Sequence, residues 1–212
     1  MKTILQPATQ AHGAKLLLSA LAAALFFVLT SCAQPVADAV GDESTHTVET
    51  PIFLDALNVA AALGSRDMDA LATYVSPDQG LRFSPYGYID TKADQVFTQE
   101  QVGSLFDDTK VYSWGAFDGS GKPIELKFSA YFDRFLWDRD FLNAETVGNN
   151  HIVGQGNTLV NIGEAYPDST FVELHFAGTQ DGGMDWSSLR LIFQEKDGLR
   201  WLVGISHDQW TI

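Results

Sequence analysis

The sequence predicts an α+β domain in which N-terminal helices pack on a strongly bent, mostly antiparallel β-sheet. Apolar residues recur at helical spacing through residues 50–75, and they alternate around tight turns in the second half of the chain. Neither internal repeats nor a regular alternation of strand and helix is present, which argues against a parallel sheet. The chain has 212 residues, enough for a targeting segment and one packed domain.

Residues 1–31 have the pattern of an export signal. They carry two lysines, no acidic residue, and an apolar run over 16–29 that is shorter than the roughly 20 residues a membrane span needs. The run leads into Leu-Thr-Ser-Cys at 29–32, which resembles the lipobox of bacterial lipoproteins. That resemblance implies that Cys32, the sole cysteine, receives acyl chains such as palmitate and becomes the new N-terminus. The alternative is an ordinary cleavable signal with an incidental cysteine.

Residues 32–49 are small, polar and acidic, and they predict a flexible tether between the lipid anchor and a domain over 50–212. Loss of the signal would leave eleven basic and 27 acidic residues, a net charge of −16 against −14 for the whole chain. So acidic a surface disfavours nucleic acid as a partner. We expect an extracytoplasmic protein anchored by lipid to the bacterial cell membrane or outer membrane. Ala33 favours the outer membrane, because lipoproteins kept at the inner membrane often carry Asp there.

The fold is expected to begin at Thr50, an N-cap followed by Pro51 at the first helical position. Apolar residues then recur at helical spacing until Gly64, which we expect to stop the helix. A second short helix is expected after Ser65 or Asp67, ending before the next proline.

Turn and capping signals place the elements that follow. An interrupted strand is predicted over 80–89, and Thr98 to Gln101 fits a capping box that opens a third helix. The remaining expected elements are strands over 111–117 and 124–128, a helix over 129–142, and strands near 152–162, 170–176, 188–194 and 201–207.

The densest pattern is a hairpin over 186–212 around the Asp-Gly pair at 197–198. A two-residue turn would pair Phe193 with Leu202 and mix polar with apolar side chains on one face. A three-residue loop with the glycine in a G1 bulge pairs Phe193 with Trp201 instead and sorts the faces cleanly. Because a slip of one residue moves side chains to the opposite face, we predict the bulged loop.

The order of helix, short break, Asp-Met-Asp-Ala-Leu-Ala-Thr-Tyr-Val at 67–75, proline and aromatic strand resembles the opening of nuclear transport factor 2-like (NTF2-like) domains. The resemblance implies a cone of helices and bent sheet, in a family that contains isomerases and dehydratases as well as proteins that only bind ligands or partners. Segments 183–191 and 203–212 also resemble uncharacterised bacterial lipoproteins, which implies no activity. No catalytic motif of the family carries over residue by residue.

One candidate ligand site follows from strand parity. Glu173 and His175 share one strand face, and Arg190 and Asp208 fall on the polar face of the hairpin, so the four could converge. The carboxylate could then orient the histidine as a general base while the arginine holds an anion. An ordinary exposed sheet face is the plain alternative.

A rival candidate site lies on the opposite face. Trp201, Ile205 and His207 could line a pocket beneath the helices, with His207 at the end where the cone opens to water. Tryptophan and histidine at such positions can equally be core residues.

Common catalytic and metal motifs are absent from the sequence, including the hydrolase elbow, the phosphate loop and the His-Glu-x-x-His helix. The histidines lack zinc-ligand spacing, and Asp-Gly-Ser-Gly at 118–121 lacks the carboxylates of a calcium loop. We therefore expect no metal or cofactor, and a domain that binds a small molecule or protein partner. The alternative is a small extracytoplasmic enzyme, an isomerase, dehydratase or hydrolase-like protein, with a histidine–carboxylate site in the cone.

Overall fold

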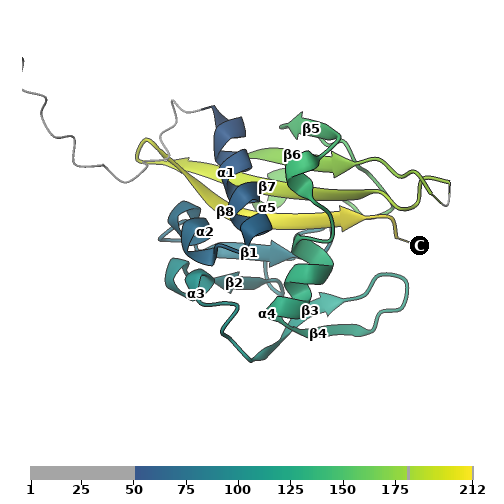
Figure 1. The fold of residues 1–212 in the computed structure, drawn as a ribbon, viewed down its shortest axis with the longest axis horizontal. Helices are drawn as coiled ribbons and strands as arrows, with labels where there is room; N and C mark the ends of the chain where they lie inside the picture. The colour runs from purple at the N-terminus through teal and green to yellow at the C-terminus, as the bar shows by residue number, and fades with distance from the viewer. Residues whose placement is uncertain (1–50, 181, 212) are drawn as a thin grey trace, which may run out of the picture. The chain divides into compact units, whose positions relative to one another are not determined.

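The computed structural model describes residues 51–180 and 182–211. The predicted export signal, the lipidation of Cys32, the tether and the N-cap role of Thr50 lie outside these residues. Within them, helices cover one face of a six-stranded sheet, which confirms the predicted α+β class and the mostly antiparallel sheet (Figure 1). No helix in this part of the chain is long and apolar enough to cross a membrane.

Helix α1 (Ile52–Ser65) forms where helical spacing predicts it. Ala56, Val59, Ala60 and Leu63 are fully buried, at the spacing of one helix face. Gly64 does not stop the helix as expected. The helix continues to Ser65, and the next residue closes it in the left-handed conformation at φ 58°.

Two short helices start at caps that the sequence predicts. Helix α2 (Met68–Tyr74) begins after Asp67, whose carboxylate accepts the Ala70 amide at 2.9 Å. Helix α3 (Gln99–Gly103) carries the predicted capping box, in which Thr98 and Gln101 each accept the other's backbone amide.

The helix expected over 129–142 is broken. Helix α4 (Phe128–Tyr131) continues as a π-helical turn over Phe132–Leu136, and a separate 3-10 turn follows at Phe141–Asn143. The break comes at Trp137, whose backbone (φ −140°, ψ 52°) leaves the helical conformation after its amide has bonded the Phe132 carbonyl.

The large sheet has the strand order β2-β1-β8-β7-β6-β5, in which only the β1–β8 pair is parallel. Its strands are β1 (Leu81–Ser84), β2 (Gln95–Phe97), β5 (Thr146–Asn149), β6 (Thr170–Phe176), β7 (Ser187–Lys196) and β8 (Leu199–Gln209). A separate hairpin consists of β3 (Val111–Ala116) and β4 (Pro123–Lys127).

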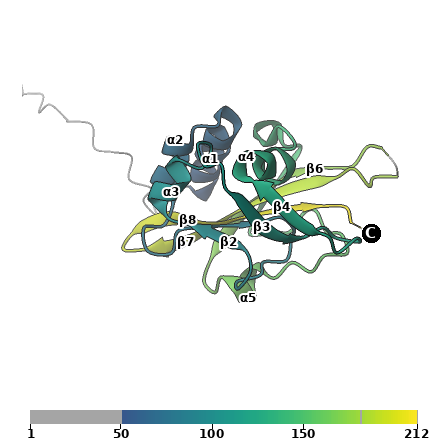
Figure 2. The same ribbon diagram turned by 90° about the horizontal axis from the view of Figure 1, so that it is seen from below.

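The strand expected over 152–162 is wrong. The strand in this region is β5, and the chain beyond it crosses the sheet face as a loop before helix α5 (Ile162–Ala165). Figure 2 shows α5 on the side of the sheet opposite α1 to α4. The loop departs from the strand because its amides bind a carboxylate of the sheet face, as described below.

The predicted register of the last hairpin is also wrong. Phe193 pairs with Leu202 and Gln194 with Trp201, so the turn has two residues, Asp197 and Gly198, both at positive φ. The bulge lies farther along β8, where the register shifts between Ile192 and Phe193. This bulge separates the apolar and polar side chains of the hairpin onto different faces, as the bulged turn was expected to do. It does so because the extra residue of β8 changes which of its positions face the helices, so that Leu202 and Ile205 both enter the core.

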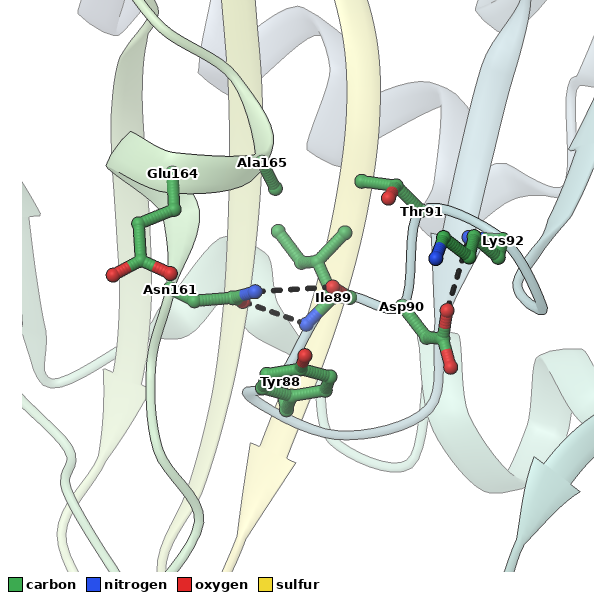
Figure 3. Close-up of a pocket in the computed structure, with 8 residues that line it drawn as sticks. All are labelled: Tyr88, Ile89, Asp90, Thr91, Lys92, Asn161, Glu164 and Ala165. Atoms are coloured by element: carbon green, nitrogen blue, oxygen red, sulfur yellow. Dashed lines mark hydrogen bonds between the residues drawn. The ribbon is translucent and has the colours of Figure 1, made fainter.

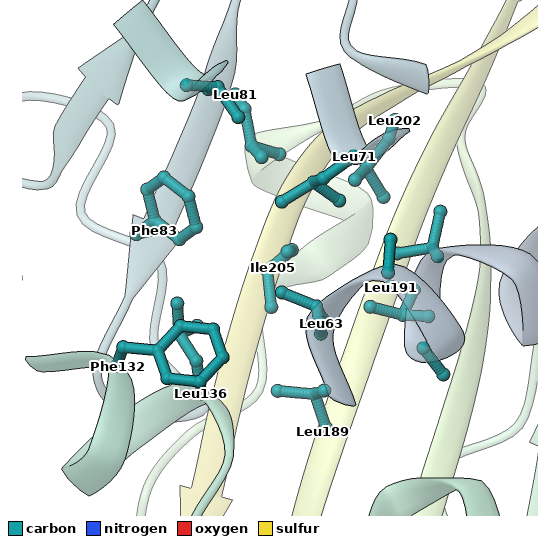
Figure 4. Close-up of a cluster of buried hydrophobic side chains, with 14 of the residues drawn as sticks. Leu63, Leu71, Leu81, Phe83, Phe132, Leu136, Leu189, Leu191, Leu202 and Ile205 are labelled. Atoms are coloured by element: carbon teal, nitrogen blue, oxygen red, sulfur yellow. The ribbon is translucent and has the colours of Figure 1, made fainter. Parts of the chain in front are cut away.

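The core fills the space between the helices and the sheet. Leu202 and Ile205 of β8 meet Leu189 and Leu191 of β7 beneath Leu63 of α1 (Figure 4). Toward β3 and α4 the core is aromatic: Trp114 stacks on Tyr131 with ring centroids 3.8 Å apart, and Phe83, Phe128 and Phe135 surround them. Side chains thus occupy the interior of the predicted cone.

A buried ion pair crosses this core. Arg200 of β8 lies on the helix side and binds Asp55 of α1 at 2.5 Å. A second, smaller apolar cluster covers the other sheet face, formed by Ile89, Ile162, Tyr166, Ile192 and Val203.

We expect Leu202→Ala to lower the free energy of unfolding by about 2–4 kcal/mol, because it opens a cavity in the core. Trp201→Ala should cost less, about 1–2 kcal/mol, since Trp201 is only partly buried on the other face. Urea unfolding of the expected domain, residues 50–212, would measure both changes. The bulged-loop register requires the reverse order, so a larger loss at Trp201 would contradict the pairing described here.

Candidate functional site

The four residues of the first predicted site do converge. Glu173 on β6 lies directly across from Arg190 on β7, and His175 and Asp208 each lie across from Ser188. All four side chains occupy the sheet face opposite the long helices, and Glu173, Arg190 and Asp208 are fully buried. The exposed polar face considered as the plain alternative is therefore not what the structure has.

Arg190 is the centre of a closed network. Its Nε donates to Glu173 at 3.0 Å, its Nη1 to Asp208 at 2.9 Å, and its Nη2 to the carbonyl of Gly154 at 2.6 Å. Every nitrogen of the guanidinium thus has a protein acceptor. The guanidinium is also fully buried, so the expectation that Arg190 holds an external anion has no exposed donor to support it.

Two loops close over this network. The amides of Val153 and Gly154 donate to the two oxygens of Glu173 at 3.0 and 2.8 Å. A Cβ at Gly154 would lie 2.4 Å from the Ser188 hydroxyl, and a Cβ at Gly87 would lie 2.6 Å from Asp208. Both positions therefore require glycine, because the loops approach the ion network too closely for any side chain.

The carboxylates on either side of Arg190 titrate differently. Burial alone would raise the pKa of Glu173, but the Arg190 charge and several hydrogen bonds hold it below its usual value. At Asp208 burial outweighs the same arginine and raises the pKa. The difference follows from the hydrogen bonds, since Glu173 accepts two loop amides as well as the guanidinium.

His175 is held by Ser188 and not by Glu173, the carboxylate that was expected to orient it. Its Nδ1 lies 2.8 Å from the Ser188 hydroxyl, and burial lowers the pKa of the ring against the opposing charge of Glu173. The ring therefore stays neutral near pH 7 and belongs to the packed shell of the ion network.

The second predicted group does not form one pocket. Ile205 is a core residue, and Trp201 lies on the other sheet face, beside Pro167 and Gln194. His207 faces the helix side but is fully buried against Phe135, so it does not lie at a mouth open to water.

His207 forms a cluster with Ser187 and Asp138. Its Nε2 lies 3.1 Å from Asp138 and 3.2 Å from the Ser187 hydroxyl, which itself lies 3.0 Å from Asp138. Since the Asp138 carboxylate can only accept, Nε2 carries the proton in this contact. In a catalytic triad the histidine uses opposite nitrogens for the serine and the acid, so this arrangement cannot activate Ser187.

A cavity that the sequence did not predict opens at the far end of β1. We call it the Asp94 groove, and its volume is about 260 Å³. It is lined by the loop after β1 (Pro85, Tyr86, Tyr88, Asp90, Ala93, Asp94), by β3 and the turn after it (Trp114, Gly115, Ala116, Asp118), and by Thr158. The available signal was the aromatic turn at 85–88 with two aspartates shortly after it.

Asp94 is the partly buried acid of this groove. Its Oδ2 accepts the Ser84 hydroxyl at 2.5 Å and the Asp90 amide at 2.9 Å. Burial raises its pKa to about 6, although these hydrogen bonds and the Arg82 charge lower it. Arg82 itself donates to the backbone carbonyls of Asp90 and Asp94 and to Tyr166. Among the described residues Asp94 forms no ion pair.

A second cavity, of about 400 Å³, adjoins the groove at Tyr88 and Asp90 (Figure 3). Asn161 fixes its wall, because its side-chain amide accepts the Ile89 amide at 2.8 Å and donates to the Ile89 carbonyl at 3.1 Å. The loop after β1 is thereby held at Gly87 by packing on Asp208 and at Ile89 by Asn161.

Metal ligands do not gather in the described part of the chain. Residues 51–180 and 182–211 contain no group of three or more His, Cys, Asp or Glu side chains that could hold a metal ion.

Comparison with known proteins adds little. No family model matches the chain, and no curated protein matches it. Among solved structures, a Xanthomonas campestris protein assigned as a calcium/calmodulin dependent protein kinase II association domain is similar over 76% of this chain and 85% of that one, at 15% identity and a TM-score of 0.30. The observed helices and mostly antiparallel sheet give an α+β fold, and a TM-score this low carries no argument about family, ligand or partner.

We expect Asp94→Asn to stabilise the fold at neutral pH but not at low pH. The amide keeps an acceptor for Ser84 and the Asp90 amide and cannot ionise. An acid whose folded pKa of about 6 exceeds its ordinary 3.8 favours folding below 3.8 and loses that contribution as the pH rises through 6. The gain at pH 7 should be about 1–2 kcal/mol, allowing for solvent screening.

Urea unfolding at both ends of this pH range measures the effect, with Asp168→Asn as a control that removes an exposed aspartate elsewhere. An equal gain at low and neutral pH would mean that the carboxyl does not titrate as described.

Proposed function

We propose that the protein is a lipid-anchored extracytoplasmic binding protein whose ligand is a small molecule held in the Asp94 groove. The anchor and the address rest on the export signal and on the lipobox resemblance at Cys32. A role in binding rests on the groove itself.

The observation that carries the proposal is the composition of the groove. It brings aromatic walls and one carboxyl with a perturbed pKa into a single cavity, which is the usual make-up of a ligand site. The residues around it are held by the buried network of Arg190 and by Asn161, so the site is formed before a ligand arrives.

A small enzyme is the second candidate, and Asp94 is the residue that favours it. A carboxyl whose pKa is about 6 lies in the range of a general base near neutral pH. The other ionisable side chains of the groove are Tyr86, Tyr88, Asp90 and Asp118, and among the described residues none of these side chains is hydrogen-bonded to Asp94 as a catalytic partner would be. Binding is therefore the preferred function.

We expect Cys32→Ser to release the protein from membranes, because the substitution removes the thiol that would carry the acyl chains. Membrane fractionation with a labelled fatty acid measures both properties. A variant that remains in the membrane fraction, together with a parent that incorporates no label, would exclude the lipid anchor.

An NMR screen of small polar and aromatic compounds tests the proposed ligand site. We expect the compounds that bind to shift the amides of 85–94 and 114–118, and Tyr88→Ala to weaken them about tenfold by removing a half-exposed ring. Trp210→Ala is the matched control, since Trp210 is a similarly exposed aromatic in a different cavity. Shifts that cluster around Trp210, or a screen without any bound compound, would contradict the proposal.

A further inference from the structure

We propose that the ligand of the Asp94 groove is a small organic cation, an ammonium group with an apolar body, and that Asp94 is its charge partner. The inference rests on the proposed function, since it names the class of molecule that the groove binds.

The charges around the groove favour a cation. Three lining side chains are carboxylates, those of Asp90, Asp94 and Asp118, and none is a lysine or arginine. The whole chain adds to this field with a formal net charge of −14. An anionic ligand would be repelled, whereas a cation would be concentrated at the groove.

Asp94 also has a free position for a cationic partner. Both of its hydrogen bonds are made by Oδ2, so Oδ1 has no hydrogen-bond partner among the described residues. A carboxylate that is partly removed from water without a counter-ion is unfavourable, and an ammonium group bound at Oδ1 would remove this penalty.

The charged and ionisable neighbours of Asp94 leave that position open. From β1, Arg82 directs its guanidinium to backbone carbonyls and Tyr166. Asp90 in the same loop adds negative charge, and Tyr131 of α4 is fully buried within electrostatic range, with its hydroxyl unpartnered among the described residues. Arg134 lies near Tyr86, but it does not line the groove.

The aromatic walls select an apolar body on the cation. Tyr88 is 50% exposed and Tyr86 is half-buried, so both can offer a ring to an alkylated ammonium group. Trp114 also lines the groove, but it is only 1% exposed because one face of its ring stacks on Tyr131, so it offers a ligand little accessible surface. A bare metal ion would gain little from such rings, whereas an alkylammonium ion gains both cation–π attraction and apolar contact.

The size of the groove limits the ligand. Its volume of about 260 Å³ is below the range of roughly 300–1,000 Å³ typical of drug-sized ligands. Choline fits this description, and 3,3-dimethyl-1-butanol has nearly the same shape without the charge.

Titration calorimetry of the full chain in a neutral maltoside detergent tests the inference with these two compounds. At pH 7.5 we expect choline to bind at least tenfold more tightly than the neutral alcohol. Asp94→Asn should weaken choline about tenfold or more and leave the alcohol unchanged. Asp168→Asn, which removes the same charge outside the groove, should leave choline binding as it is.

The pH dependence gives a readout that a purely structural role would not change. Because the pKa of Asp94 is about 6, only about a tenth of it is ionised at pH 5, and choline should bind about tenfold more weakly there than at pH 7.5. The Asp94→Asn variant should show no such dependence.

The outcomes separate the inference from the proposed function. Equal affinity for choline and the alcohol, or unchanged choline binding in Asp94→Asn, would overturn the cation assignment while the groove remains a ligand site. If choline does not bind and the fragment screen finds only neutral or anionic ligands in the groove, the assignment is likewise wrong. If no compound binds there, both proposals fail.

Discussion

The buried contacts of Arg190 with Glu173 and Asp208 are the interaction on which the second face of the sheet depends. Removing three charges from water is costly, and the network offsets that cost only because each guanidinium nitrogen and both Glu173 oxygens are hydrogen-bonded. Three of those hydrogen bonds are made by Val153 and Gly154 of the loop after β5, and Asp208 lies close against Gly87 of the loop after β1. The charges therefore fix the loops, and the loops form the walls of the cavities.

The helix side of the sheet is filled by the hydrophobic core. A pocket was expected beneath the helices, and that space is occupied by Trp114, Tyr131 and the surrounding phenylalanines. What remains accessible lies at the edge of this aromatic cluster, where the Asp94 groove borders the buried face of Trp114. The groove therefore has a rigid wall supplied by the core, while the groove itself lies outside the core.

Local signals allowed part of this to be predicted. Helical spacing and the caps at Asp67 and Thr98 gave the short helices, and strand parity alone placed Glu173, His175 and Arg190 together. The local sequence does not show that the loop over 150–161 covers these residues. The course of that loop depends on hydrogen bonds from its amides to the Glu173 carboxylate, which belongs to β6. For the same reason the cluster, which could have been an exposed polar face, is buried.

The prediction of the hairpin register was wrong because a bulge inside β8 satisfies the hydrophobic pattern as well as a bulge at the turn does. Asp94 was not predicted because its raised pKa depends on burial in the folded chain, which the local sequence does not show.

The position of β8 in the middle of the sheet also has a consequence for how the chain reaches its native state. Arg82 of β1 pairs with Gly204 of β8, and β8 separates β1 from β7. β1 therefore has no inner neighbour until residues 199–209 are available to pair with it. Pairing between such distant segments slows folding. The six-stranded sheet can be completed only when the last strand of the chain takes its place between β1 and β7.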